Sequence, residues 1–406
     1  MRQMRALIIG AGIAGLAAAG ALARDGWETT VLEQASGPRT AGYMIDFFEP
    51  GFTAAQSLGA LSNLREYGQF YTRARYVDAT GQTRAQLSMD SFLNAAGGKF
   101  FSILRPDIER GLREWVGHST DIVQGAKVVS LDPGRYPDSG APARVTLQDG
   151  REFGAELLIG ADGIHSTVRS CLPVSAGGRQ GTGPDRFLRH LGFHVFGYVF
   201  SDAALAARLG AEVLLTDSLT RQAGLYALPD GRVTFFGIVA CNDPAPDTAM
   251  REDLFTRFRG LGPLVDQALE RRPADMYEDF VAQSVVGLWH HGRSILLGDA
   301  AYAVSPLAGQ GASLAVAGAE LLTRTLRERD NDLSTAFADY EAAWRPVVEE
   351  QQAAGRRNTR FFVPPNRTSL LLRRGALHLM NLRGLNAFMA RRAFGSVLPT
   401  QGPWAP

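Results

Sequence analysis

Three glycines near the start of the chain have the spacing of a phosphate-binding turn. Gly10, Gly12 and Gly15 form the pattern Gly-x-Gly-x-x-Gly, and Glu33 follows after about 20 residues. Glycines at this spacing let the backbone approach a pyrophosphate, and the helix that follows adds unpaired N–H groups and a partial positive charge. A carboxylate at position 33 would accept a hydrogen bond from a ribose hydroxyl and disfavours a 2′-phosphate. These residues predict a dinucleotide site that does not take NADP.

The flanking residues predict the elements that would position this turn. Residues 5–9 form a short apolar run, which is typical of a buried parallel strand, and residues 28–33 predict a second strand. Between them, residues 13–24 are rich in alanine and leucine and predict a helix that begins with Ile13 and Ala14. This strand–helix–strand context makes the glycine pattern specific.

Two later stretches place aspartates where strands are expected to end. They are "LLIGADGIHSTVR" at residues 157–169, with Asp162, and "SILLGDAAYAVSPLAGQGASLAVAGAELL" at residues 294–322, with Asp299. At these stretches the chain resembles the group A flavin monooxygenases, the relatives of para-hydroxybenzoate hydroxylase. All three motifs occur in the family's order and spacing, so the resemblance covers nearly the whole chain. The stretch "GYMIDFF" at residues 42–48 is most similar to the tetracycline-inactivating and polyketide-tailoring branch.

The resemblance implies that the dinucleotide is FAD. Asp299 would bind a ribityl hydroxyl, Arg105 and Arg39 would hold phosphates or the ribityl chain, and Asp162 and Arg169 would serve both FAD and the reductant. Helix capping would explain the two aspartates equally, and ordinary solvent exposure would explain Arg39 and Arg105. The expected cofactor-binding residues are Gly10, Gly12, Ile13, Ala14, Gly15, Glu33, Arg39, Arg105, Asp162, Asp299, Pro306, Gly309, Gln310, Gly311 and Ala312.

The resemblance also implies a reaction. In the family, NAD(P)H reduces the flavin, O₂ adds at flavin C4a, and the hydroperoxide passes one oxygen atom to a bound substrate. We therefore expect hydroxylation of an aromatic or polyketide-like molecule, as in secondary metabolism or antibiotic modification. The cofactor carries this chemistry, so we name no residue as acid, base or nucleophile and no metal site. One dinucleotide fingerprint is present, which fits a reductant that binds transiently.

The substrate is expected to lie against a sheet formed by residues 187–240. This region is rich in β-branched and aromatic residues and has a Pro-Asp-Gly turn at residues 229–231. A largely apolar pocket between this sheet and the flavin would suit a polycyclic molecule. The aromatic residues could instead fill a core, and the arginine among them could form a surface ion pair. The expected substrate-binding residues are Arg221, Phe193, Tyr226 and Phe236.

We expect an α/β fold with a Rossmann-like FAD-binding domain, an inserted β-sheet substrate domain and C-terminal helices. One of these helices, at residues 367–394, is basic and amphipathic, which favours packing on the FAD-binding domain over lying on a membrane. The expected boundaries are residues 1–180 and 280–330 for the FAD-binding domain, 181–279 for the substrate domain and 331–406 for the C-terminal segment.

The composition limits the partners. With 42 Lys and Arg against 41 Asp and Glu, the 406-residue chain lacks the basic excess of a nucleic-acid-binding protein. Its two cysteines, Cys171 and Cys241, are too few for a disulfide framework, which favours a cytoplasmic location. No apolar run is long enough to span a bilayer. We expect a small-molecule enzyme that is a monomer or homodimer.

Other activities remain open on the sequence alone. Epoxidation and Baeyer–Villiger oxygenation use the same flavin chemistry as hydroxylation. An FAD-dependent reductase or dehydrogenase would share the fold but insert no oxygen atom, and a flavin-binding sensor would consume no NAD(P)H in response to a substrate. The choice between NADH and NADPH is also open.

Overall fold

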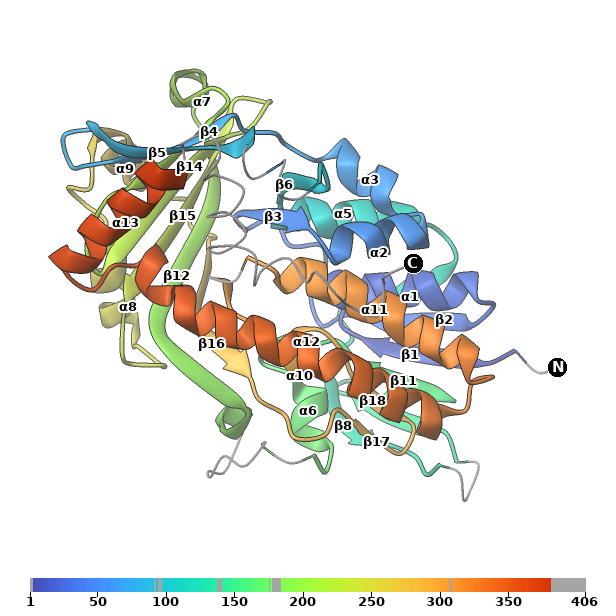
Figure 1. Ribbon diagram of the computed structural model, residues 1–406. Helices are drawn as coiled ribbons and strands as arrows, with labels where there is room; N and C mark the ends of the chain where they lie inside the picture. The colour runs from blue at the N-terminus through green and yellow to red at the C-terminus, as the bar shows by residue number, and fades with distance from the viewer. Residues whose placement is uncertain are drawn as a thin grey trace.

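A six-stranded sheet holds the glycine turn (Figure 1). The computed structural model describes residues 3–90, 93, 97–136, 141–174, 176, 184–306 and 309–380. The sheet has the order β17-β18-β11-β1-β2-β7, and every pair is parallel except β17 with β18. Its strands are β1 (Arg5–Ile9), β2 (Glu28–Leu32), β7 (Thr120–Val123), β11 (Leu157–Gly160), β17 (His290–His291) and β18 (Ser294–Leu296). The two strands and the helix expected around the glycines are confirmed.

Helices pack on this sheet, and residues at or just after the carboxyl ends of β1, β2 and β11 line a cleft. The helix α1 packs against α11, and their alanines and glycines allow this close contact. The helices of this half are α1 (Ile13–Arg24), α2 (Gly51–Leu58), α3 (Leu61–Glu66), α5 (Arg105–Val116), α6 (Thr167–Cys171), α10 (Asp299–Tyr302) and α11 (Gly311–Glu328).

Two small sheets border this half. One pairs β3 (Met44–Phe48) with β6 (Phe100–Leu104), and it brings the stretch that contains residues 42–48 beside the start of α5. The other has the order β10-β9-β8, and both of its strand pairs are antiparallel. Its strands are β8 (Val128–Asp132), β9 (Ala143–Leu147) and β10 (Glu152–Ala155).

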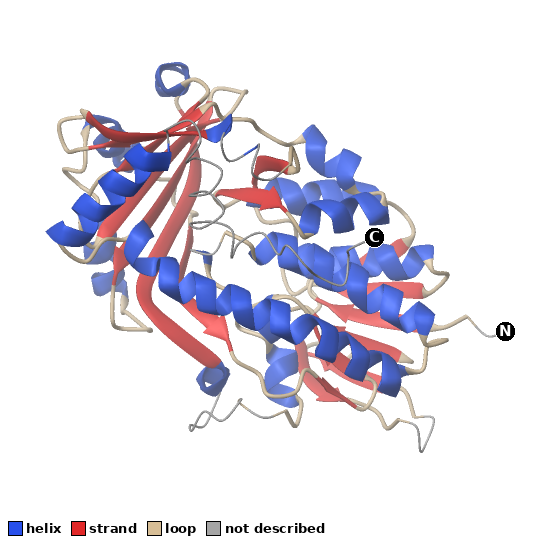
Figure 2. Ribbon diagram, in the orientation of Figure 1, coloured by secondary structure: helices blue, strands red, loops and turns tan. Residues whose placement is uncertain are grey.

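A seven-stranded sheet forms the other half of the molecule (Figure 2). Its order is β16-β12-β15-β14-β13-β4-β5, antiparallel except for β13 with β4. Two of its strands come from residues 73–88, which lie outside the range 181–279 expected for this sheet. The strands are β4 (Arg73–Val77), β5 (Thr83–Ser88), β12 (Leu188–Ser201), β13 (Glu212–Thr216), β14 (Arg221–Ala227), β15 (Arg232–Ala240) and β16 (Tyr277–Ser284), and a 3-10 turn, η1 (Pro184–Phe187), precedes β12.

The two faces of this sheet have different neighbours. One face packs on α7 (Ala203–Leu209), α8 (Thr248–Thr256) and α9 (Pro263–Glu270) around a core that includes Phe196, Tyr198 and Phe235. The opposite face carries Val195, Ile238 and Val281 and turns toward the six-stranded half. The alternation of side chains along each strand separates these two sets.

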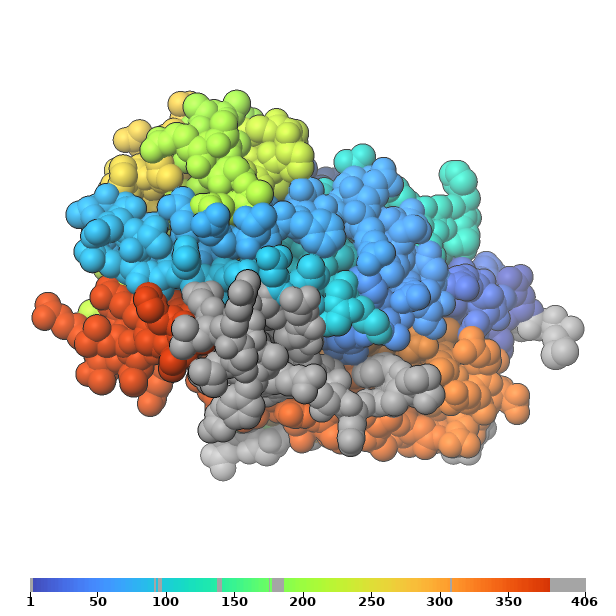
Figure 3. Space-filling view, turned by 45° about the horizontal axis from the view of Figure 1, so that its top comes forward, coloured from blue at the N-terminus to red at the C-terminus, as the bar shows by residue number. Residues whose placement is uncertain are grey.

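A long helix connects the two halves. The helix α12 (Leu333–Phe362) runs from the six-stranded sheet to the edge of the seven-stranded one, and α13 (Arg367–Met380) then returns across β5 (Figure 1). In Figure 3 the residues of α13 and of β4–β5 adjoin on the molecular surface. Of the amphipathic segment expected at residues 367–394, residues 381–394 lie outside the described part of the chain. None of the described helices has the length and apolar character that a membrane crossing requires.

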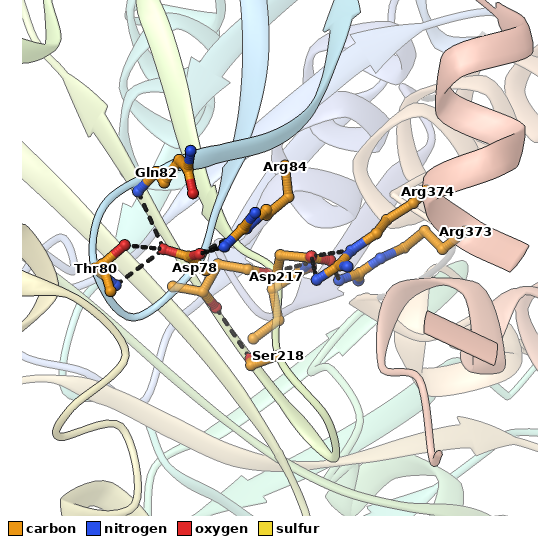
Figure 4. Close-up of polar contacts among 10 residues, drawn as sticks. Asp78, Thr80, Gln82, Arg84, Asp217, Ser218, Arg373 and Arg374 are labelled. Atoms are coloured by element: carbon orange, nitrogen blue, oxygen red, sulfur yellow. Dashed lines mark hydrogen bonds and ion pairs between the residues drawn. The ribbon is translucent and has the colours of Figure 1, made fainter. Parts of the chain in front are cut away.

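A buried ion pair holds α13 on the sheet. Asp217, just after β13, accepts hydrogen bonds from Arg373 at 2.8 Å and Arg374 at 2.5 Å (Figure 4). The side chains of Asp217 and Arg373 are each 1% exposed, and the Arg373 guanidinium lies 5.1 Å from the ring centre of Tyr76. Figure 4 also shows Asp78, whose carboxylate accepts hydrogen bonds from the turn between β4 and β5.

Candidate active site

The glycine turn has the geometry that its sequence predicts. Gly10 has a φ of +104°, which disfavours any residue with a side chain. A Cβ on Gly15 would lie 1.9 Å from the carbonyl oxygen of Gly10, so only glycine lets α1 approach the end of β1. A Cβ on Gly12 would meet no protein atom within 4 Å. The turn is therefore packed tightly from behind and open in front, as a cradle for a pyrophosphate should be.

The carboxylate of Glu33 is fixed by two backbone N–H groups. Ala11 donates to Oε2 and Ala35 donates to Oε1, each at 2.8 Å. A carboxylate can accept about four hydrogen bonds, so both oxygens keep capacity for a ribose hydroxyl. Glu33 thus joins the glycine turn to the end of β2 and still faces the cleft.

The turn lies at one end of a cleft that extends to the seven-stranded sheet. Two expected cofactor residues, Gly15 and Gln310, are buried beneath its surface instead of lining it. The expected residues that line it are Gly10, Gly12, Ile13, Ala14, Glu33, Arg39, Arg105, Asp162, Asp299, Pro306, Gly309, Gly311 and Ala312. Segments about 300 positions apart in the sequence are therefore brought to one surface.

Asp299 and Arg105 set the charge in the middle of the cleft. Asp299 lines the cleft. The surrounding protein removes its carboxyl from bulk water and so raises its pKa, and the positive charge of Arg105 partly offsets this effect. Burial alone would lower the pKa of Arg105, but Glu109 and neighbouring groups outweigh it and raise that pKa. The Arg105 guanidinium contacts Glu109 at 3.0 Å, and the Glu109 side chain is 7% exposed. The cleft therefore contains an arginine that is ion-paired with Glu109 and an aspartate whose pKa is raised.

Asp162 lines the cleft and also organises the turn before α6. Its carboxylate accepts hydrogen bonds from the N–H groups of Thr167 at 2.7 Å and Val168 at 3.0 Å, and from the Ser166 hydroxyl. Burial raises the pKa of Asp162, and these hydrogen bonds act in the opposite direction. Asp162 therefore pairs with N–H groups in the first turn of α6, which is the capping role that the sequence analysis left open.

Arg169 differs from the role implied by the family. It is fully buried and donates to the carbonyl oxygens of Ala300 at 2.8 Å and Ile164 at 2.6 Å. Burial lowers its pKa to about 10. Arg169 does not line the cleft, so the structure assigns it to joining α6 and α10 instead of to ligand contact.

An aromatic wall closes the end of the cleft next to the sheet. The ring of Tyr43 lies 5.0 Å from Phe236 and 5.3 Å from Tyr277, centre to centre. Tyr43 and Tyr277 line the cleft beside Arg105 and Asp299. Burial raises the pKa of Tyr43 to about 12 and raises that of Tyr277 well above its ordinary value. We call Tyr43, Phe236 and Tyr277 the aromatic wall.

Sequence reasoning missed most of this wall. Tyr43 is part of the stretch at residues 42–48 that carried the family resemblance, so this resemblance could have identified Tyr43 as a site residue. Tyr277 begins β16 without a motif around it, and only the fold places it opposite Tyr43. His165 and Arg113 also line the cleft and were not expected there.

The expected substrate residues separate into three places. Phe236 belongs to the aromatic wall through its contact with Tyr43, but it does not itself line the cleft. Tyr226 is on the same face of the sheet but packs against Tyr71, 5.6 Å away between ring centres, and Phe193 lines a separate cavity.

Arg221 requires a correction. It pairs with Val239 across the sheet, so both side chains are on the face covered by α8 and α9. That face is turned away from the cleft, and Arg221 is not among the cleft-lining residues.

Comparisons with known proteins identify the family of this chain. Residues 3–351 match the family described as FAD binding domain. An FAD-dependent urate hydroxylase of Mycolicibacterium vanbaalenii is 27% identical over 348 residues, covering 84% of each chain.

Two solved structures show the same fold. The tetracycline destructase Tet(55) superposes with a TM-score of 0.77 at 24% identity over 96% of this chain and 97% of that chain. A variant of HpxO from Klebsiella pneumoniae, complexed with FAD, gives 0.79 at 23% identity over 99% of this chain and 100% of that one. With the family match, they confirm the resemblance found in the sequence: this chain belongs to the FAD-binding-domain family of group A flavin-dependent monooxygenases.

Proposed function

We propose that this protein uses FAD, NAD(P)H and O₂ to hydroxylate an aromatic or polyketide-like small molecule. The observation that carries the proposal is the position of the aromatic wall, whose Tyr43 and Tyr277 share one cleft with the glycine turn, Arg105 and Asp299. A planar substrate placed between this wall and a flavin would stack on rings and stay out of water.

The residues of the cleft fit FAD. The open space in front of Gly12 suits the pyrophosphate, and Glu33 has spare acceptor capacity for the adenosine ribose. Asp299 would bind the ribityl chain, and the first N–H groups of α11 at Gly311 and Ala312 would meet the pyrimidine edge of the flavin. Bound FAD supplies the redox and oxygen-transfer chemistry. Gly15 and Gln310 support these contacts from beneath.

The two tyrosines of the wall have a defined protonation state. Because burial raises the pKa of both Tyr43 and Tyr277, their hydroxyls stay protonated at neutral pH. A neutral phenol can donate a hydrogen bond to a carbonyl or phenolic oxygen of a substrate. The wall would therefore orient a substrate that carries oxygen substituents on flat rings.

The similar proteins support this substrate class. Their names refer to urate and tetracycline, which are both ring systems with several oxygen atoms. We assign substrate binding to the side of the cleft formed by the seven-stranded sheet, which includes β4 and β5. Antibiotics and secondary metabolites include such ring systems, so we propose that the protein modifies a molecule of this kind. A monomer or homodimer in the reducing cytoplasm fits the free thiols of Cys171 and Cys241.

The test is a substrate panel with an oxygen electrode. The FAD-loaded protein is mixed with NADH or NADPH and with purines, tetracyclines, phenols or hydroxyquinolines. We expect at least one ring compound to stimulate NAD(P)H oxidation and O₂ uptake together. Turnover that needs an artificial electron acceptor, with no O₂ uptake, would show a dehydrogenase instead.

A further inference from the structure

A second cavity lies outside the cleft. Its lining residues come from β12, the end of α12 and the start of α13, which lie close together in Figure 1. Its volume of about 680 Å³ is within the usual range for small-molecule sites. The site described above uses none of its residues. The lining is formed by Arg189, His190, Leu191, Phe193, Arg356, Thr359, Arg360, Val363, Pro365, Asn366 and Ser369.

The cavity concentrates positive charge without a carboxylate. Three guanidinium groups line it, those of Arg189, Arg356 and Arg360, and no Asp or Glu is among its described lining residues. Arg356 donates to the neutral Gln283 side chain at 2.7 Å. Burial, together with the charges of Arg189 and Arg357, lowers the pKa of Arg356. Guanidinium groups that line one cavity repel one another, and a bound anion would relieve that repulsion.

The rest of α12 shows that this arrangement is not a general property of the helix. Three turns earlier, Arg345 pairs with Glu341 and contacts Glu349 at 3.8 Å. The negative end of a helix favours cations in its last turn, which explains Arg360 alone. It does not explain Arg189, which comes from β12 and converges on the same cavity.

The cavity also has apolar lining residues and lies next to the cleft. Phe193, Leu191 and Val363 would cover one face of an aromatic base. His190 lies 4.5 Å from Phe280 between ring centres, and Phe280 lines the cleft. The two spaces therefore share a wall.

We infer that this cavity binds the phosphate-bearing adenosine end of the nicotinamide cofactor, and that its arginines select NADPH over NADH through the 2′-phosphate. Arginine suits this role because its planar fork of donors matches phosphate oxygens. The inference rests on the proposed function, since that function requires a reductant. It also assigns the phosphates of FAD and of the reductant to separate places, because Glu33 disfavours a 2′-phosphate at the glycine turn.

The test uses Arg189→Gln and Arg360→Gln in the FAD-loaded full chain, with Arg208→Gln on the exposed side of α7 as the matched control. We expect the KM for NADPH to rise about 10-fold or more in each cavity variant, as loss of a charge-assisted hydrogen bond implies. The KM for NADH and the kcat at saturating NADPH should change less than about 2-fold, and Arg208→Gln should match the wild type. Arg189→Lys should recover part of the affinity, because a point charge remains.

A binding measurement tests the cavity separately from the proposed monooxygenase function. Calorimetric titration of FAD-loaded protein with NADP⁺, NAD⁺ and inorganic phosphate reports on the cavity without turnover. Tighter binding of NADP⁺ than NAD⁺ that is lost in both glutamine variants supports the inference, even if no substrate is found. Unchanged NADP⁺ affinity and unchanged KM for NADPH in both variants would overturn it and leave the monooxygenase function intact. A wild type that oxidises neither nucleotide in the substrate panel would count against the proposed function instead.

Discussion

The N–H of Ala11 donates a hydrogen bond to Oε2 of Glu33 at 2.8 Å, and this contact joins the glycine turn to the end of the neighbouring strand. The residue expected to hold the ribose is therefore also the residue that sets the position of the turn. Loss of its carboxylate removes a ligand contact and loosens the phosphate cradle at the same time.

Glu33→Ala should greatly reduce FAD retention. We expect FAD to bind about 10-fold to 100-fold more weakly, since hydrogen bonds to a charged group contribute about 1.5–3 kcal/mol. Flavin fluorescence titration of the apoprotein measures this change. Glu28→Gln, an exposed carboxylate at the start of β2, is the control and should bind FAD normally. Equal affinity in Glu33→Ala and the wild type would remove Glu33 from the site.

Two glycine substitutions should separate ligand binding from folding. Gly12→Val adds a side chain where no protein atom lies within 4 Å of the new Cβ, so the apoprotein should keep its melting temperature and lose FAD. Gly15→Ala places a Cβ 1.9 Å from the Gly10 carbonyl oxygen and should destabilise the apoprotein itself. Thermal unfolding and the ratio of flavin to protein test both. A Gly12→Val protein that purifies with full flavin content would contradict the assignment.

Asp299→Asn should stabilise the apoprotein while it weakens FAD binding. The pKa of Asp299 is raised in the folded protein, so the folded state binds its proton more tightly than the unfolded state. Stability is then lost as the pH rises from the ordinary aspartate pKa through the raised one, and the loss is complete above it. The variant should melt above the wild-type apoprotein at neutral pH, and the difference should vanish in acid. A lower melting temperature at neutral pH would show that the carboxylate is stabilising.

Asp217→Asn should detach α13 from the sheet. The substitution leaves Arg373 buried without its charged partner, which typically costs about 3–5 kcal/mol in the free energy of unfolding. Denaturant unfolding and hydrogen exchange of residues 367–380 measure the effect. Asp230→Asn breaks the exposed pair with Arg232 and should change stability by less than about 1 kcal/mol. Equal losses in the two variants would mean that burial of the pair has no special weight.

The sequence predicted the parts of the fold that local patterns specify. The glycine turn and its strand–helix–strand unit follow from residues that are close in the chain. The strands at residues 73–88 were not expected in the seven-stranded sheet, because β4 pairs with β13 more than 130 positions later. Such pairing depends on the tertiary fold and leaves little trace in local sequence.

The candidate site shows the same division. Motif residues such as Asp299 were found because their spacing repeats a family pattern, whereas Tyr277 has no motif and depends on the path of β16. Arg221 was expected among the substrate-binding residues because it lies in the strand-rich region, but the sequence of that region does not show which face of the sheet each side chain occupies. A shift of one residue moves a side chain to the opposite face of a sheet, and the structure places Arg221 under α8 and α9.

Oxygen transfer to the substrate is the central claim, and isotope labelling tests it most directly. The FAD-loaded protein, NAD(P)H and a stimulating ring compound are incubated under ¹⁸O₂ in ordinary water, and the product is analysed by mass spectrometry. We predict one labelled oxygen atom per product molecule, and no label when ¹⁸O is supplied as water. An unlabelled product formed under ¹⁸O₂ would contradict the claim.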